Sequence, residues 1–192
     1  MPKDDLPIIA FESQSRWEEW LAENHAQQPT GIWLRIFKKA SGVVSVTYAE
    51  ALDEALCYGW IDGQANKYDE RSWLQKFTSR RKKSIWSKVN TQHVERLIEA
   101  GKMKAAGLKE IEAAKQDGRW QQAYDSPKNM IVPEDFLKEL ENDSKAKTFF
   151  ETLNKTNLYS IAFRLQTAKK PETREKRMKA ILEMLARGEK FH

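Results

Sequence analysis

The sequence predicts an α+β protein, with a small, mostly antiparallel sheet flanked by helices and a helical C-terminal part that follows it. Three observations favour this fold class. Residues 32–37 alternate at strand periodicity, and residues 60–68 and 72–79 are rich in aromatic side chains and lack helical periodicity. From Trp86 onward, apolar residues recur at helical spacing. Strands followed by a run of helices are typical of α+β proteins.

The first half of the chain should hold two helices besides its strands. A capping-box pattern at residues 15–18 predicts a helix over about 16–24. A second capping box at residues 47–50 opens another helix, which Gly59 should end. The strands 60–68 and 72–79 should then pair as an antiparallel hairpin, and we expect their Ile61 and Leu74 sides to face the core.

The second half should be helical throughout. Two helices should end near Gly101 and Gly118, and residues 124–129 form the best candidate linker. Pro133, with two acids after it, marks a helix start, since the first turn does not need the amide that proline lacks. The last helix should run from Pro171 to Gly188, with four apolar residues inward: Met178, Ile181, Leu182 and Leu185. We expect an α+β domain over residues 1–125 and a helical region over 126–192, which can share one core.

Composition narrows the class of protein. With 192 residues, 40% hydrophobic and 32% charged, the chain resembles a globular protein that folds on its own. It opens with mixed charge, so we expect no signal peptide. No stretch approaches the ~18 uninterrupted apolar residues of a membrane helix, so we expect no membrane insertion. The one cysteine, Cys57, cannot form an internal disulfide, and we expect a cytoplasmic protein.

Several segments are similar to one known family. The run 50–63 contains Cys-Tyr-Gly-Trp-Ile-Asp-Gly, and further matching segments lie at 77–81, 84–90, 118–124 and 168–177. Together they resemble the YdeI/OmpD-associated (bacteriocin-protection) family over nearly the whole chain. One departure is Ser79, where members of that family often have proline. The resemblance implies a bacterial protein linked to tolerance of bacteriocins or envelope stress, and it implies no catalytic activity that could be carried over.

The residues indicate no catalytic or metal site. Cys57 lies near Asp53 and Glu54 at the negative end of its helix, and both effects raise a thiol pKa, so we interpret it as a packed thiol. The three histidines, His25, His93 and His192, have no second ligand at helical spacing. We therefore expect no metal and no cofactor.

One face of the predicted hairpin is unlike a plain core. Strand alternation places Trp60, Asp62, Gln64 and Asn66 on the same side, and three residues of the second strand should join them: Trp73, Gln75 and Phe77. An acid and amides among aromatic rings resemble an aromatic-walled ligand cleft. The alternative is an exposed sheet face, or one covered by the C-terminal helices through polar contacts. The sequence leaves both open.

Basic residues gather just after this hairpin. The net charge is +5, and residues 71–90 carry seven lysines and arginines and no acid. The cluster Arg80–Lys83 has three interpretations. It could bind nucleic acid, or it could be a solvated turn. It could also hold a small anion, with Arg80 or Arg81 as a two-point clamp and the helix start after Ser84 as an anion seat. The cations of the last helix alternate with acids and should form an exposed, salt-bridged helix face.

The resemblance implies a bacterial stress-tolerance protein of undefined biochemical activity. The residues show no recognisable catalytic motif and favour the binding of a small anionic ligand or a partner. The candidate binding residues are Trp60, Asp62, Gln64, Arg80, Arg81, Ser84 and Trp86. One alternative is an enzyme acting on an anionic or nucleotide-like metabolite, with Asp62 as acid or base and Arg80 or Arg81 as electrostatic stabiliser. Another is a nucleic-acid-binding protein that uses residues 71–90. The oligomeric state stays open.

Overall fold

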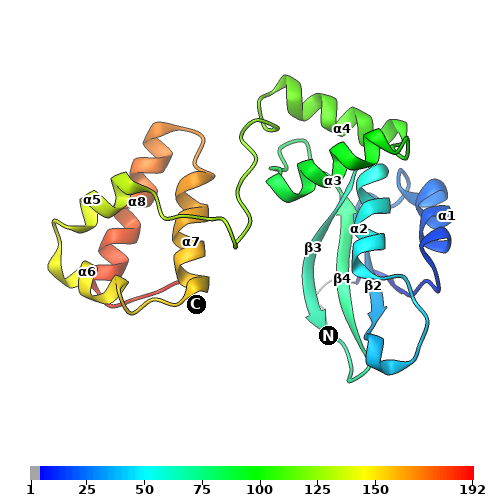
Figure 1. Cartoon of the computed structure of the whole chain (residues 1–192), viewed down its shortest axis with the longest axis horizontal. Coiled ribbons are helices and arrows are strands. Elements are labelled where there is room, and N and C mark those ends of the chain that lie inside the picture. The colour runs from blue at the N-terminus through cyan, green and yellow to red at the C-terminus, as the bar shows by residue number, and fades with distance from the viewer. Residues whose placement is uncertain (1–4) are drawn as a thin grey trace. The chain divides into compact units, whose positions relative to one another are not determined.

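The computed structural model describes residues 5–192 and has an α+β fold, as the sequence predicts (Figure 1). The chain forms two compact units. The first comprises residues up to 85 together with 90–121, and the second comprises residues 86–89 together with 122–192. The domain boundary expected after residue 125 stays a prediction. No helix within residues 5–192 is long and apolar enough to cross a membrane.

The sheet lies in the first unit and has four strands in the order β1-β2-β4-β3. They are β1 (Ile8–Ile9), β2 (Ile32–Phe37), β3 (Trp60–Lys67) and β4 (Ser72–Ser79). The short β1 runs parallel to β2, whereas the β2–β4 and β3–β4 pairs are antiparallel. The predicted hairpin and the mostly antiparallel character of the sheet are confirmed.

The helices of the first unit are α1 (Gln14–Asn24), α2 (Tyr48–Cys57), α3 (Lys88–Glu99, which begins in the second unit) and α4 (Ala105–Gln116), and a 3₁₀ turn covers Lys39–Ser41. The capping box of α2 is present, with Thr47 and Glu50 bonded to each other's backbone amides. The expected start of α1 is wrong by two residues. Its cap is Ser13, whose hydroxyl accepts from the Arg16 amide, so the helix begins before the Ser15 pattern.

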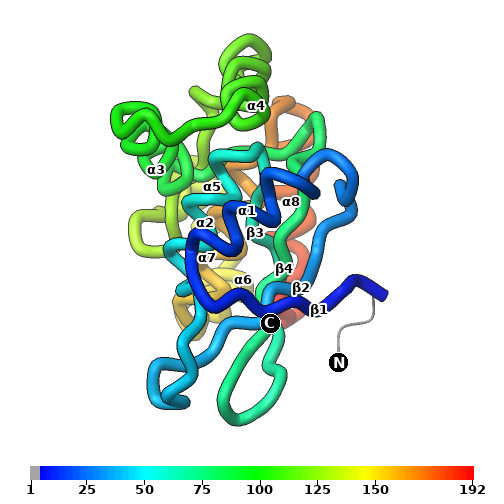
Figure 2. Tube along the Cα trace, turned by 90° about the vertical axis from the view of Figure 1, so that its right-hand side faces the viewer, coloured from blue at the N-terminus to red at the C-terminus, as the bar shows by residue number. Residues whose placement is uncertain are grey.

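Helices α1 and α2 pack against each other on one face of the sheet (Figure 2). Trp17 of α1 is fully buried, and its indole Nε1 donates to the Ala51 carbonyl of α2 at 3.0 Å. Its ring lies 5.7 Å from the ring of Phe77 and 6.4 Å from that of Trp60, measured between ring centroids. These tryptophans thus join both helices to β3 and β4.

The side of β3 that faces this core differs from the expectation. Trp60 is buried beneath α1, whereas Ile61 is only half-buried. Leu74 is fully buried as expected, but it pairs with Asn66. A bulge between Asp62 and Ala65 shifts the register, so the expected row of Trp60, Asp62, Gln64 and Asn66 ends at Asp62. A bulge moves every later side chain to the other face.

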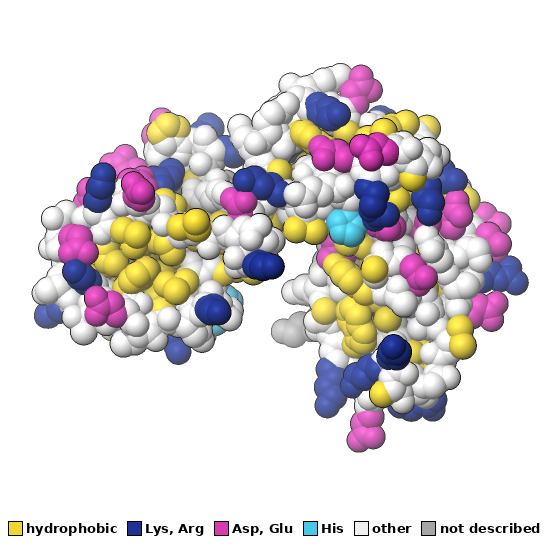
Figure 3. All heavy atoms as spheres, in the orientation of Figure 1, with side chains coloured by type: hydrophobic (Ala, Val, Ile, Leu, Met, Phe, Trp, Pro, Cys, Tyr) yellow, Lys and Arg dark blue, Asp and Glu magenta, His cyan; other side chains and the backbone are white. Residues whose placement is uncertain are grey.

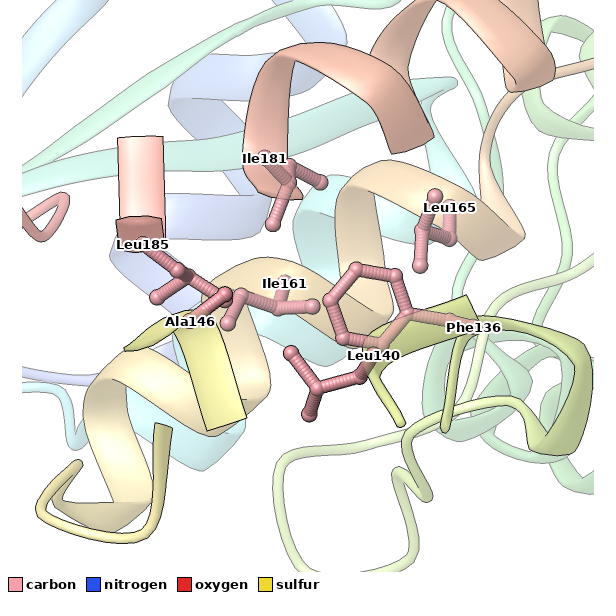
Figure 4. Packing of buried hydrophobic residues seen from close by; sticks show 7 residues of the cluster. All are labelled: Phe136, Leu140, Ala146, Ile161, Leu165, Ile181 and Leu185. Atoms are coloured by element: carbon pink, nitrogen blue, oxygen red, sulfur yellow. The ribbon is translucent and has the colours of Figure 1, made fainter. Parts of the chain in front are cut away.

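The second unit contains α5 (Glu134–Leu140), α6 (Ser144–Phe150), α7 (Lys155–Gln166) and α8 (Pro171–Ala186). Seven buried residues form its core, which Figure 4 shows: Phe136, Leu140, Ala146, Ile161, Leu165, Ile181 and Leu185. Met178 and Leu182 pack against this core, as their spacing predicts. Apolar side chains also gather on the face of this unit seen in Figure 3.

We expected the cations of α8 to pair with acids of the same helix, but two of them bond to other helices. The Arg174 guanidinium bonds to the Asp135 carboxylate of α5, and Arg177 Nη1 donates to the Arg164 carbonyl of α7 at 2.7 Å. Both side chains therefore connect α8 to neighbouring helices. The reason is that residues on one face of a packed helix meet the ends of adjacent helices as well as each other.

In the first unit, two glycines with positive φ give a matched test of how closely the chain before β2 approaches β4. Gly31 has φ +90°, and a Cβ there would lie 2.0 Å from the Phe77 carbonyl oxygen. Gly42 has φ +70° and nothing within 4 Å of such a Cβ. We expect Gly42→Ala to lower the free energy of unfolding by about 1 kcal/mol, from backbone strain alone. Gly31→Ala should cost roughly 1–3 kcal/mol more, because β2 and β4 must separate.

Urea unfolding followed by tryptophan fluorescence measures both losses. Equal losses for the two variants would contradict the close approach of Gly31 to β4.

Candidate functional site

The basic cluster lies in a closed turn immediately after β4. The Arg80 amide donates to the Gly59 carbonyl at 3.0 Å and so ties the turn to the start of β3. The Ser84 amide donates to the Arg81 carbonyl at 2.8 Å, and the Arg81 amide donates to the Ser84 hydroxyl at 3.1 Å. We call residues 80–84 the basic turn. Its backbone is fixed by hydrogen bonds at both ends.

Two buried arginine side chains hold the basic turn from within. Arg80 is 5% exposed, and its Nη1 approaches the Ile85 carbonyl at 3.4 Å. Arg119 is 4% exposed, and its Nη1 donates to the Ser84 carbonyl at 2.9 Å. Its Nε lies 2.7 Å from the Asp117 carboxylate. Sequence reasoning did not select Arg119 as a site residue, although it lies in the matching segment 118–124, because it is 35 residues away from Ser84.

The cations that the basic turn presents to solvent are Arg81, Lys82 and Lys83, which are all exposed. The structure therefore distinguishes the two arginines that we expected as alternative clamps, because Arg80 is buried and Arg81 is exposed. The amides of Lys82 and Lys83 donate to no group within residues 5–192. Three cations and two available N–H groups thus occupy one short turn.

The helix start that we expected after Ser84 lies beyond the basic turn, and the anion seat there stays a prediction. Helix α3 begins at Lys88, and the Ser84 hydroxyl is already bonded to Arg81 within the basic turn. Residues 86 and 87 are extended instead, because the Tyr124 amide donates to the Trp86 carbonyl at 3.0 Å and Ser87 pairs with Tyr124. An extended segment cannot offer the aligned amides of a first helical turn.

The remaining candidate residues occupy different environments. Trp60 is 1% exposed, and its Nε1 donates to the His25 carbonyl at 3.1 Å, so its ring belongs to the core. Asp62 accepts a hydrogen bond from the Tyr48 hydroxyl at 2.8 Å, across to α2. Gln64 is exposed at the bulge. Trp86 is buried and belongs to the second unit. Trp60 and Phe77 are therefore covered by the aromatic rings of α1, and not by the C-terminal helices that the sequence offered as an alternative.

Titratable groups also gather between α2 and α3. Asp53 accepts from Arg96 at 2.7 Å, and its Oδ1 lies 2.9 Å from His93 Nδ1. Burial opposes ionisation of Asp53, but the hydrogen bonds from Arg96 and His93 outweigh it and lower the pKa of this carboxyl. Within residues 5–192, no group of three or more histidine, cysteine or acidic side chains could hold a metal ion.

Cys57 lies on the next turn of α2 and is fully buried. Burial, and then the charges of Glu54 and Asp53, raise the pKa of its thiol to about 12. The predicted direction of the shift is confirmed, and the sequence identified two of its causes.

The fold and the site define a class of two-unit α+β proteins, in which the sheet unit carries an exposed basic turn and a separate helical unit follows. The chain belongs to the family described as domain of unknown function (DUF8412), whose model matches residues 9–110, and its residues 129–188 match the family described as bacteriocin-protection, YdeI or OmpD-associated. No curated protein and no solved structure matches the chain.

These matches confirm the YdeI/OmpD-associated resemblance over residues 129–188, whereas its expected extent over nearly the whole chain is wrong. The basic segment 168–177 lies inside the stretch that matches this family, whereas the run 50–63 lies inside the stretch that matches the domain of unknown function. The family with a bacteriocin-protection description therefore corresponds to the helical unit, and the basic turn lies in the unit of undefined function.

The raised pKa of Cys57 predicts slow alkylation of the folded protein. Near neutral pH, we expect iodoacetamide to react with Cys57 at least about a hundredfold more slowly than with a free thiol, because only the thiolate attacks. The same protein in concentrated urea should react at the rate of a free thiol, which is the internal control. Mass spectrometry of the alkylated fraction over time measures both rates. Rapid modification of the folded protein would contradict the buried, neutral thiol.

Proposed function

We propose that the protein binds a small anionic ligand, bearing phosphate or carboxylate groups, at the basic turn. The observation that carries this proposal is the exposure of Arg81, Lys82 and Lys83 on a turn whose backbone is held by the buried side chains of Arg80 and Arg119. A cation cluster on a fixed backbone loses less conformational entropy on binding than one on a mobile loop.

The backbone of the turn supports the same chemistry. The available amides of Lys82 and Lys83 are donors of the kind that anions accept in turns and nests. Arg81 adds a planar guanidinium that can pair with a carboxylate or phosphate at two points, whereas a lysine provides a mobile point charge. In this proposal Arg81 is the anchor, and the two lysines attract the anion from solution.

We further propose a binding role in stress tolerance in place of catalysis. The support is the bacteriocin-protection description of the family that residues 129–188 match. A cytoplasmic location is part of the proposal and rests on the single, buried Cys57. Asp62, the acid or base of the enzyme alternative, is engaged by the Tyr48 hydroxyl.

The test uses inorganic pyrophosphate as the probe and isothermal titration calorimetry of the full chain. We expect saturable binding by the wild type. Arg81→Lys should lose at least ~1 kcal/mol of binding free energy, the scale of a charge-assisted hydrogen bond. The double variant Lys82→Gln with Lys83→Gln should weaken binding mainly at low salt, because a screened field acts only over about 10 Å at 0.1 M salt. Lys109→Gln, an exposed charge removal on α4, is the matched control and should have no effect.

Three outcomes contradict the proposal. The wild type could fail to bind pyrophosphate. Equal losses with equal salt slopes for Arg81→Lys and the double lysine variant would reduce the basic turn to a generic basic patch. Tight, strongly salt-dependent binding of a single-stranded oligonucleotide without pyrophosphate binding would favour the nucleic-acid alternative.

A further inference from the structure

The first unit contains a groove that no predicted site residue lines. It has a volume of about 780 Å³, and its walls come from the start of α1, the segment before α2, α2 itself and the loop between α3 and α4. Four carboxylates and two lysines line it: Glu12, Glu18, Glu50, Glu54, Lys102 and Lys104. The groove lies entirely within one compact unit, so its shape does not depend on the second unit.

Glu54 is the unusual member of this set. It is only 6% exposed although it lines the groove. Its Oε1 accepts from the side-chain Nε2 of Gln14 at 2.6 Å, whereas its Oε2 accepts no hydrogen bond from any of residues 5–192. Oε2 keeps some exposure to solvent, so it opens onto the groove while the rest of the side chain is buried. The structure therefore keeps one acceptor of a buried carboxyl group available at the groove.

The lysines of the groove do not supply that donor. Lys104 Nζ is paired with Glu18 at 2.8 Å and lies 5.7 Å from the centre of the Tyr58 ring. Lys102 is exposed and makes no hydrogen bond with Glu54. Glu50, one helical turn before Glu54, uses one oxygen in the capping box of α2. Negative charge thus outweighs positive charge around the available oxygen.

We propose that this groove is a separate binding site for a small ligand with a primary ammonium group, which donates to Oε2 of Glu54 while Glu50 attracts the rest of a cationic chain. Residues i and i+4 of a helix lie side by side on its surface, so a short diamine can reach both carboxylates. An ammonium supplies the missing donor and compensates the buried negative charge. This site is independent of the basic turn and takes ligands of the opposite charge.

The affinity of the groove for an ammonium ligand should depend on pH through Glu54. Burial raises the pKa of Glu54, and the Gln14 hydrogen bond offsets this only in part; Glu18 raises it further, while Lys102 and Lys104 lower it. These are the charged groups that face Glu54 from α1 and from the α3–α4 loop. A bound ammonium favours the ionised carboxylate, so binding should release a proton wherever free Glu54 is partly protonated. Affinity should therefore rise with pH and level off above the raised pKa.

The experiment titrates the full chain with 1,4-diaminobutane in a calorimeter, at several pH values from about 4.5 upward, starting near the ordinary carboxyl pKa. Two buffers with different heats of ionisation report the protons released. The wild type should bind with proton release at low pH and more tightly as pH rises. Glu54→Gln, which keeps the size of the side chain, should bind at least about tenfold more weakly and release no proton. Glu95→Gln, an exposed charge removal on α3, should bind like the wild type.

The wild-type pH dependence and proton count test the proposal even if Glu54→Gln misfolds, which circular dichroism would reveal. Absence of binding by the wild type, binding without proton release, or unchanged affinity in folded Glu54→Gln would each overturn it. So would equal binding of butanedioate, a dianion of similar length, because it would show no preference for an ammonium group.

Discussion

The contact of Trp17 with the sheet is the constraint on which the first unit depends. This one fully buried ring meets Trp60 of β3 and Phe77 of β4, and its indole nitrogen holds the backbone of α2. Large aromatic rings bury roughly 150–250 Å² each, and burial contributes about 25 cal/mol per Å². The cluster therefore contributes several kcal/mol and fixes the two strands whose ends carry the basic turn. Arg80 follows β4 directly and bonds to Gly59, which connects α2 to β3.

Buried charged side chains lie at both proposed binding sites, the basic turn and the groove. Arg80, Arg119 and Glu54 are each at least nine-tenths buried. Removing a charge from water costs several kcal/mol, so these buried groups need not contribute to the free energy of unfolding. Arg80 and Arg119 hold the backbone that presents Arg81 to solvent, and Glu54 keeps an acceptor at its groove. In the two proposals, buried charge has different roles: it positions neighbouring residues at the basic turn, and it would bind the ligand directly at the groove.

Local signals in the sequence predicted most of the fold. The alternation of β2, the capping box at Thr47 and the proline before α5 each depend on neighbouring residues, and each is found in the structure. The bulge after Asp62 could not be predicted, because strand alternation gives no sign of where an extra residue is accommodated. The expectation that Ile61 faces the core was wrong, because its neighbour Trp60 occupies the space under α1.

The candidate sites were harder to predict because they depend on residues far apart in the chain. The sequence located the cations of the basic turn, but only the fold shows that Arg80 is buried and that Arg119 supports Ser84. The groove at Glu54 combines α1, α2 and the α3–α4 loop, and Gln14 lies 40 residues from its partner. In the sequence, Glu54 had significance only as a neighbour of Cys57. Periodicity places residues on a helix face, but it does not show which other element meets that face.

The central claim is that the basic turn, held by hydrogen bonds from Arg80 and Arg119, binds the anion. An NMR titration of the isotope-labelled full chain with inorganic pyrophosphate tests this claim most directly. We expect saturable shifts concentrated on the backbone amides of residues 81–85 and on the side-chain Nε–H of Arg119, whose partner Ser84 belongs to the turn. Shifts spread over the lysines of α8 and the rest of the surface, without saturation and without a maximum at residues 81–85, would contradict it.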